Sequence, residues 1–123
     1  MTLNEYQQQA MTTCLPEAEN FSYMMLNLVG EVGEFAGKVA KSIRKGQVKM
    51  LRNGDFSYHI AMSREDMEHH TKELQKEAGD ILWQLSGLCS VMGWRLEDIA
   101  QQNLDKLADR KSRQVIDGSG DNR

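Results

Sequence analysis

Apolar residues recur every three or four positions along most of the chain, which is the period of an amphipathic helix. The longest apolar stripe comprises Phe21, Met24, Met25, Leu28, Val32, Phe35, Val39 and Ile43. Pro16 suits the first turn of this helix, and Gly93 suits the end of a later one. The sequence therefore predicts an all-α fold of four helices, over residues 3–13, 17–44, 63–92 and 96–113.

The stretch between the second and third helices, residues 44–62, lacks the helical period. Asn53-Gly54 separates two short segments rich in strand-forming residues, which indicates a small hairpin. A loop of this length in a small domain is seldom featureless. Two interpretations stand: a solvated insertion without a role, or a lid that brings a cation near bound phosphates, from among Arg44, Lys45 and Lys49.

Composition limits the class of protein. A chain of 123 residues with 40% hydrophobic residues suits one globular domain, and its net charge of −3 argues against a nucleic-acid surface. No apolar run approaches the roughly 20 residues that span a bilayer, and the first residues lack a signal-peptide pattern. Cys14 and Cys89 show no metal-binding spacing, so we expect reduced thiols and a cytoplasmic protein. Residues 1–123 should form a single domain, with an N-terminal helical segment (1–15), the insertion (44–62) and a flexible tail (114–123).

Two acidic motifs carry the candidate chemistry: Glu31-Val-Gly-Glu34 on the second helix and Glu77-Ala-Gly-Asp80 on the third. Each motif places two carboxylates three residues apart, on one helix face. A single pair of this kind is usually a solvated surface. Four carboxylates brought together in a small fold repel one another unless a cation lies between them. The pattern therefore favours a site for Mg²⁺, with Mn²⁺ as the alternative, since Mg²⁺ prefers oxygen ligands and phosphate partners.

Polar residues flank the apolar stripes in rows, at about 100° per residue on a helical wheel. We expect the rows to line one cavity, with carboxylates for metal and cations for phosphate, although basic residues near a helix C-terminus also simply complement its dipole. A glycine seam at Gly30, Gly33 and Gly37 indicates close approach of another helix. The polar rows are Asn27, Glu31, Glu34, Lys38 and Lys41 on the second helix, Glu73, Glu77, Asp80 and Gln84 on the third, and Asn103, Lys106 and Arg110 on the fourth.

The remaining distinctive side chains have plainer interpretations. Trp83 points away from the main stripe of its helix, so it forms either a secondary core or a subunit interface. The histidines show no metal-ligand spacing, and we expect them on the surface: His59, His69 and His70.

Taken together, the linked motifs resemble the MazG-like nucleotide pyrophosphohydrolases, of the all-α nucleoside triphosphate pyrophosphatase superfamily. The resemblance rests on Gly30-Glu-Val-Gly-Glu34, on residues 73–83 and on Asn103-Leu-Asp-Lys-Leu107; the tail, 118–123, resembles those of small bacterial and phage members. It implies that four acids bind Mg²⁺, namely Glu31, Glu34, Glu77 and Asp80. It also implies that Asn103 and Lys106 lie near the substrate.

The resemblance further implies an activity and an assembly. The expected reaction is hydrolysis of a ribo- or deoxynucleoside triphosphate to the monophosphate and pyrophosphate, which would remove unwanted nucleotides from the pool. Glu34 is our first choice for orienting the water, together with Glu31, while Lys38, Lys106 and Arg110 stabilise the polyphosphate. A homodimer or homotetramer is expected, in which helices of two subunits complete each bundle.

One departure leaves two other functions open. The family often has a glutamate where this chain has Gly30, so one carboxylate is missing. The first alternative is a non-catalytic helical interaction module that keeps the fold. The second is hydrolysis of another pyrophosphate, such as phosphoribosyl-ATP, on the same scaffold.

Overall fold

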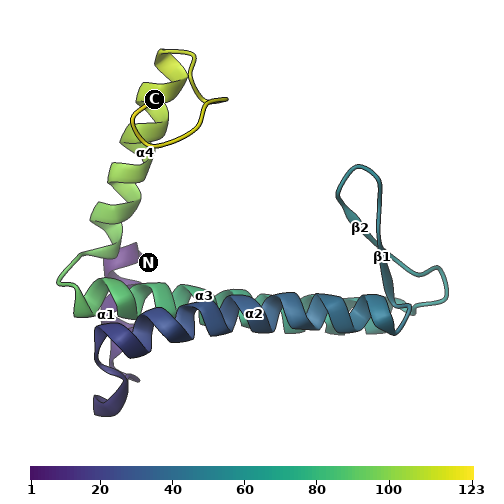
Figure 1. Ribbon diagram of the computed structural model, residues 1–123. Coiled ribbons are helices and arrows are strands. Elements are labelled where there is room, and N and C mark those ends of the chain that lie inside the picture. The colour runs from purple at the N-terminus through teal and green to yellow at the C-terminus, as the bar shows by residue number, and fades with distance from the viewer.

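Helices α2 (Phe21–Arg44) and α3 (Arg64–Val91) form the centre of the computed structural model, which describes residues 1–123 (Figure 1). They run antiparallel, side by side. Helix α1 (Leu3–Met11) packs against one end of the pair, and α4 (Leu96–Ser112) projects away from that end. A hairpin of β1 (Val48–Met50) and β2 (Phe56–Tyr58) lies at the opposite end (Figure 1). The predicted all-α fold with four helices and a small hairpin is confirmed.

The helix boundaries follow local capping. Ser63, the predicted start of the third helix, caps α3 by accepting a hydrogen bond from the Asp66 backbone N–H. The second helix begins at Phe21, later than predicted, because Asn20 is extended and its side chain accepts from the Tyr23 N–H. Pro16 instead begins a separate 3₁₀ turn, Pro16–Ala18, and the first and last helices end within two residues of the predicted positions.

The hairpin is antiparallel, with Val48 opposite Tyr58 and Met50 opposite Phe56. The Tyr58 hydroxyl lies 3.0 Å from His70 Nδ1 and 3.0 Å from Thr71 Oγ1, so the hairpin is attached to α3. The insertion is therefore a structured element at the far end of the helix pair (Figure 1).

The core is small, with 11 of 123 residues buried. Met24 is fully buried between α2 and α3, and its side chain occupies the space that a Cβ at Gly87 would need. Within one chain the close helix approach is therefore at Gly87, and no helix lies against the predicted seam, where a Cβ at Gly33 or Gly37 would meet nothing within 4 Å. Trp83 belongs to a secondary core, because its Nε1–H donates to α1 and the following turn, at Ala10 O and Thr13 Oγ1.

Many large apolar side chains are exposed in the single chain. Leu26 is 69% and Val29 67% exposed on α2, and Leu104 is 60% exposed on α4. The expectation that the full stripes pack inside is wrong for one chain, because only α3 lies along α2 and nothing lies along most of α4. Four residues of the predicted α2 stripe are exposed, namely Phe21, Met25, Val32 and Ile43, and so are Leu85 and Met92 near the end of α3 and Leu104 and Leu107 on α4. None of the helices has the length and apolar character needed to cross a membrane.

Candidate metal and phosphate site

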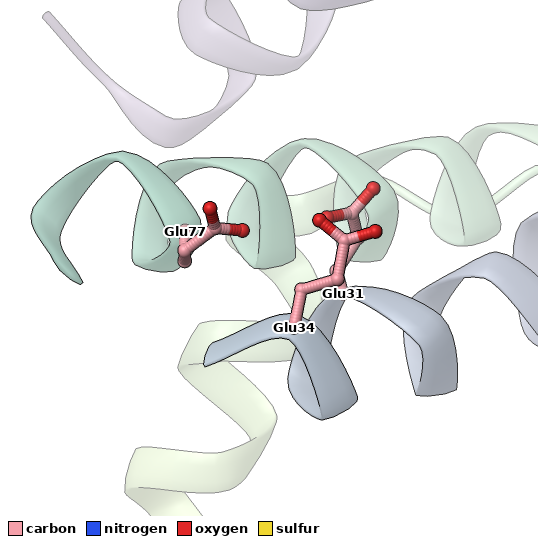
Figure 2. Close-up of side chains that lie close together, drawn as sticks. All are labelled: Glu31, Glu34 and Glu77. Carbon is pink, nitrogen blue, oxygen red and sulfur yellow. The ribbon is translucent and has the colours of Figure 1, made fainter. Parts of the chain in front are cut away.

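Three of the four predicted carboxylates meet in the groove between α2 and α3. Glu31 and Glu34 come from α2 and Glu77 from α3, and one oxygen of each lies within 4.8 Å of the others. Figure 2 shows the two α2 side chains extending toward α3, where Glu77 lies. Asp80 is one turn further along α3, exposed and outside this cluster, although its charge still acts on Glu31. We call Glu31, Glu34 and Glu77 the acidic cluster.

Like charges crowd the acidic cluster. The pKa of Glu31 is raised, first by burial and then by the negative charges of Glu34, Asp80 and Glu77. A hydrogen bond from Asn27 Nδ2, at 3.4 Å, acts in the opposite direction and favours the charged form. Carboxylates whose pKa is shifted by burial and by neighbouring charges are found more often at functional sites.

Glu77 is the most buried member, at 6% exposure, and its two oxygens differ in environment. Oε1 forms an ion pair with Lys38 Nζ at 2.5 Å, whereas Oε2 is buried with no hydrogen-bond partner. A buried carboxylate oxygen without a partner loses the full free energy of its hydration. This unpartnered oxygen is the independent feature that points to a bound ligand.

Lys38 connects the acidic cluster to Glu73. Its Nζ lies 3.3 Å from Glu73 Oε2, and the other Glu73 oxygen accepts from Lys76 Nζ at 2.6 Å. The hydrogen bond to Glu77 is the main cause that raises the pKa of Lys38, and the bond from Lys76 is the main cause that lowers the pKa of Glu73. Lys38 is therefore held at the edge of the site.

The donor set fits a hard divalent cation. Three carboxylates from two helices supply only oxygen atoms, which Mg²⁺ and Mn²⁺ accept, and Glu77 Oε2 has an unused coordination capacity. Because neither Cys nor His joins the acidic cluster, the set does not favour Zn²⁺.

The predicted substrate residues of α4 lie apart from the acidic cluster. Helix α4 contacts α1 and the end of α3, and projects away from the α2–α3 groove (Figure 1). Arg110 is buried against the tail, where its Nη2 lies 2.9 Å from Asp121 Oδ1, and Lys106 Nζ reaches the same oxygen at 3.3 Å. These two cations lower the pKa of Asp121. One chain therefore does not join Asn103, Lys106 and Arg110 to the acidic cluster in a single cavity.

A cavity of about 260 Å³ continues the groove beyond Lys38, toward the hairpin. The expectation that His70 is a surface residue is wrong, because it is half-buried, with Nε2 2.6 Å from Ser42 Oγ and Nδ1 in contact with Tyr58. The signal was present in the sequence, since His70 precedes Glu73 by three residues and so shares its helix face. We call this the basic cavity; its lining is Lys38, Lys41, Ser42, Lys45, Gln47, Met62, Asp66, His69, His70 and Glu73.

Of the three cations suggested for a lid, only Lys45 lines the basic cavity. Lys49 lines a neighbouring cavity of about 590 Å³ at the base of the hairpin, together with apolar residues such as Ile43 and Val48. Arg44 lines neither cavity.

Comparison with known proteins identifies the family. A model described as the MazG nucleotide pyrophosphohydrolase domain matches residues 19–115. The chain is also 40% identical over 106 residues to the Gene 37 protein of Mycobacterium phage L5, which covers 85% of this chain and 78% of the phage protein. No solved structure matches significantly. The resemblance that the sequence motifs indicated is confirmed, and the chain belongs to the MazG nucleotide pyrophosphohydrolase family.

Proposed function

We propose that the protein hydrolyses a nucleoside triphosphate to the monophosphate and pyrophosphate, with Mg²⁺ bound at the acidic cluster of Glu31, Glu34 and Glu77. The observation that carries the proposal is the convergence of these three carboxylates, one of them with a buried unpartnered oxygen. Membership of the MazG family supports the choice of reaction. The two free cysteines support a reducing compartment such as the cytoplasm.

The ligand roles follow from burial. Glu77 is buried and fixed by Lys38, so it serves as the rigid ligand, while Glu31 is half-buried and supplies the second. Asp80 is one helical turn from Glu77, and its charge helps to raise the pKa of Glu31. We therefore assign Asp80 to the same site, where it would bind a water molecule of the hydrated ion and not the ion directly. When bound, Mg²⁺ neutralises phosphate charge and favours departure of the leaving group.

Glu34 is the most exposed carboxylate of the cluster, so we assign it to the attacking water. In this step the water oxygen forms a bond to the α-phosphorus and a proton passes to the Glu34 carboxylate. The bond between the α-phosphorus and the bridging oxygen breaks, and that oxygen leaves with pyrophosphate. Lys38, which lies at the edge of the acidic cluster, stabilises the charge that develops on the phosphates.

A second copy of the chain is part of this proposal. The exposed apolar residues of α2 and α4 lack a partner within one chain, and burying them against another chain is favourable. A homodimer or homotetramer would allow α4 of one subunit to bring Asn103, Lys106 and Arg110 toward the groove of another. The empty space beside Gly33 and Gly37 supports a helix docking on that face.

The test is a panel of ribo- and deoxynucleoside triphosphates, assayed for phosphate with and without added inorganic pyrophosphatase. We expect phosphate only when pyrophosphatase is present, and direct separation of the nucleotides should show the monophosphate with Mg²⁺ and none in EDTA. Glu34→Gln should lose turnover while Glu65→Gln, an exposed residue outside the site, keeps it. Phosphate without pyrophosphatase would contradict the assigned bond. No turnover of any nucleotide or of phosphoribosyl-ATP would favour a non-catalytic interaction module.

A further inference from the structure

The groove between α2 and α3 changes from acidic to basic along its length. On α2, Lys38, Lys41 and Lys45 follow Glu34 at helical spacing and continue the same face toward the hairpin. On the antiparallel α3, Glu77 is followed in that direction by Glu73 and then by His70 and His69, which line the basic cavity. Lys38 belongs to both regions, because it pairs with Glu77 and also lines the cavity. The acidic cluster and the basic cavity therefore adjoin.

The basic cavity contains cationic charge without a protein partner. Of its two carboxylates, Glu73 is already paired with Lys38 and Lys76, and Asp66 lies in the first turn of α3 with no ion pair. Neither Lys41 nor Lys45 has a carboxylate within ion-pair distance. These two ammonium groups are therefore available to an anion, as are the donors of the exposed His69.

The hairpin and α3 hold the floor of this cavity in place. Ser42 is 5% exposed, and its hydroxyl donates to Lys38 O at 2.8 Å, which leaves its oxygen to accept from His70 Nε2 at 2.6 Å. The other ring nitrogen of His70 contacts Tyr58 of β2 at 3.0 Å. The insertion between the acidic motifs therefore fixes one wall of the cavity through a chain of hydrogen bonds.

We propose that the basic cavity is the subsite for the two terminal phosphates of the substrate, and hence for the pyrophosphate product, with Lys41 and Lys45 as its binding residues. The inference rests on the proposed function. The basic cavity has a volume of about 260 Å³, slightly below the roughly 300–1,000 Å³ of sites that enclose drug-sized ligands. This size suits a small anion better than a whole nucleotide. The α-phosphate then lies at the acidic cluster, and the nucleoside extends along the groove away from the hairpin.

The same assignment gives the insertion a role. The leaving pyrophosphate departs toward lysines of the same subunit that supplies the acidic cluster. Those lysines stabilise its charge without help from α4. Lys45 is the C-cap residue that directly follows α2, and Gln47 and Met62, near the two ends of the insertion, also line the cavity.

The experiment is calorimetric titration of inorganic pyrophosphate into the full chain, in EDTA at low ionic strength and again with Mn²⁺. Lys41→Gln/Lys45→Gln should weaken pyrophosphate binding about tenfold, since two charge-assisted contacts are lost. The matched control, Lys72→Gln/Lys111→Gln, removes the same net charge from exposed lysines without ion pairs and should bind as the parent does. Circular dichroism checks that both double variants keep the helical fold.

The outcomes separate this inference from the proposed function. Equal weakening in both double variants, or unchanged binding in Lys41→Gln/Lys45→Gln, would overturn the subsite. If no nucleotide is hydrolysed, but Lys41→Gln/Lys45→Gln (the cavity variant) binds pyrophosphate more weakly and the control variant does not, the subsite stands and the proposed function fails. Normal turnover and pyrophosphate affinity in the cavity variant would leave the function standing and refute the subsite.

Discussion

Replacing Glu31 by glutamine should stabilise the metal-free protein while removing its response to metal. The pKa of Glu31 is raised above its ordinary value of 4.5, so the folded state holds this proton more tightly than the unfolded state. Between these two pKa values the native state binds more protons, and stability falls as the pH rises through the folded value. At neutral pH the ionised carboxylate is therefore a source of instability that Mg²⁺ would relieve.

The magnitude follows from the spacing of the acidic cluster. The carboxylate oxygens lie within 4.8 Å of one another. Two unit charges at that distance in water repel by about 0.9 kcal/mol, and physiological salt reduces this repulsion roughly by half. Glu34 and Glu77 are both within that distance of Glu31, so Glu31→Gln should add about 1 kcal/mol to the unfolding free energy. For a domain of this size the expected rise in Tm is about 4 °C. The amide oxygen of glutamine can still accept from Asn27.

The assay is thermal unfolding followed by circular dichroism at one protein concentration, in EDTA and in Mg²⁺. At neutral pH in EDTA, Glu31→Gln should melt higher than the parent. The difference should shrink as the pH falls through the raised pKa of Glu31 and disappear below the ordinary value of 4.5. Added Mg²⁺ should raise the Tm of the parent and leave that of the variant unchanged. Glu19→Gln, at an exposed side chain without hydrogen bonds or ion pairs, is the control. A variant that is equal or less stable than the parent in EDTA would refute this reasoning.

Three further outcomes test the packing and the assembly. Leu26→Asp/Val29→Asp places charges on the exposed face of α2 and should shift the protein toward monomer in light scattering; an unchanged mass would show that this face is not the interface. Met24→Ala removes a fully buried side chain and should lower the unfolding free energy by about 2–4 kcal/mol in urea titrations, whereas a loss below about 1 kcal/mol would contradict its place in the core. Asp121→Ala removes the carboxylate that holds Arg110, so amide hydrogens of the tail should exchange faster. Because the pKa of Asp121 is lowered by Arg110 and Lys106, acid that protonates Asp121 should produce the same effect in the parent, and equal exchange rates would contradict the contact.

The helical fold could be predicted from sequence because its signals are local. Ser63 and Gly93 mark the ends of α3 through capping and a positive φ, and Asn53-Gly54 marks the hairpin turn. The start of α2 could not be placed in the same way. Pro16 and Asn20 are both plausible starting residues, and the structure shows that the proline begins a separate turn while Asn20 caps the helix.

The acidic part of the candidate site was predictable for a similar reason. Residues three apart share a helix face, so Glu31 and Glu34 had to point together, and antiparallel packing of α2 on α3 brings Glu77 to them. The position of α4 was not predictable. An amphipathic stripe indicates that one face of a helix is buried, but it does not indicate which helix, of the same chain or of another, packs against that face. In one chain, Lys106 and Arg110 contact Asp121 of the tail, away from the acidic cluster.

His70 shows what periodicity alone misses. Its partners, Ser42 and Tyr58, come from the second helix and from the insertion, and their meeting depends on how the hairpin folds back on α3. The basic cavity depends on the same long-range contact.

The most direct test of the acidic cluster is Mn²⁺ binding measured by electron paramagnetic resonance, where bound ions lose the signal of the free hexa-aquo ion. We expect the parent protein to bind Mn²⁺ saturably, Mg²⁺ to displace it, and Glu31→Gln/Glu77→Gln to abolish this binding without loss of helix. A parent protein that leaves the free signal unchanged, with and without a non-hydrolysable triphosphate, would contradict the metal site from which the proposed activity follows.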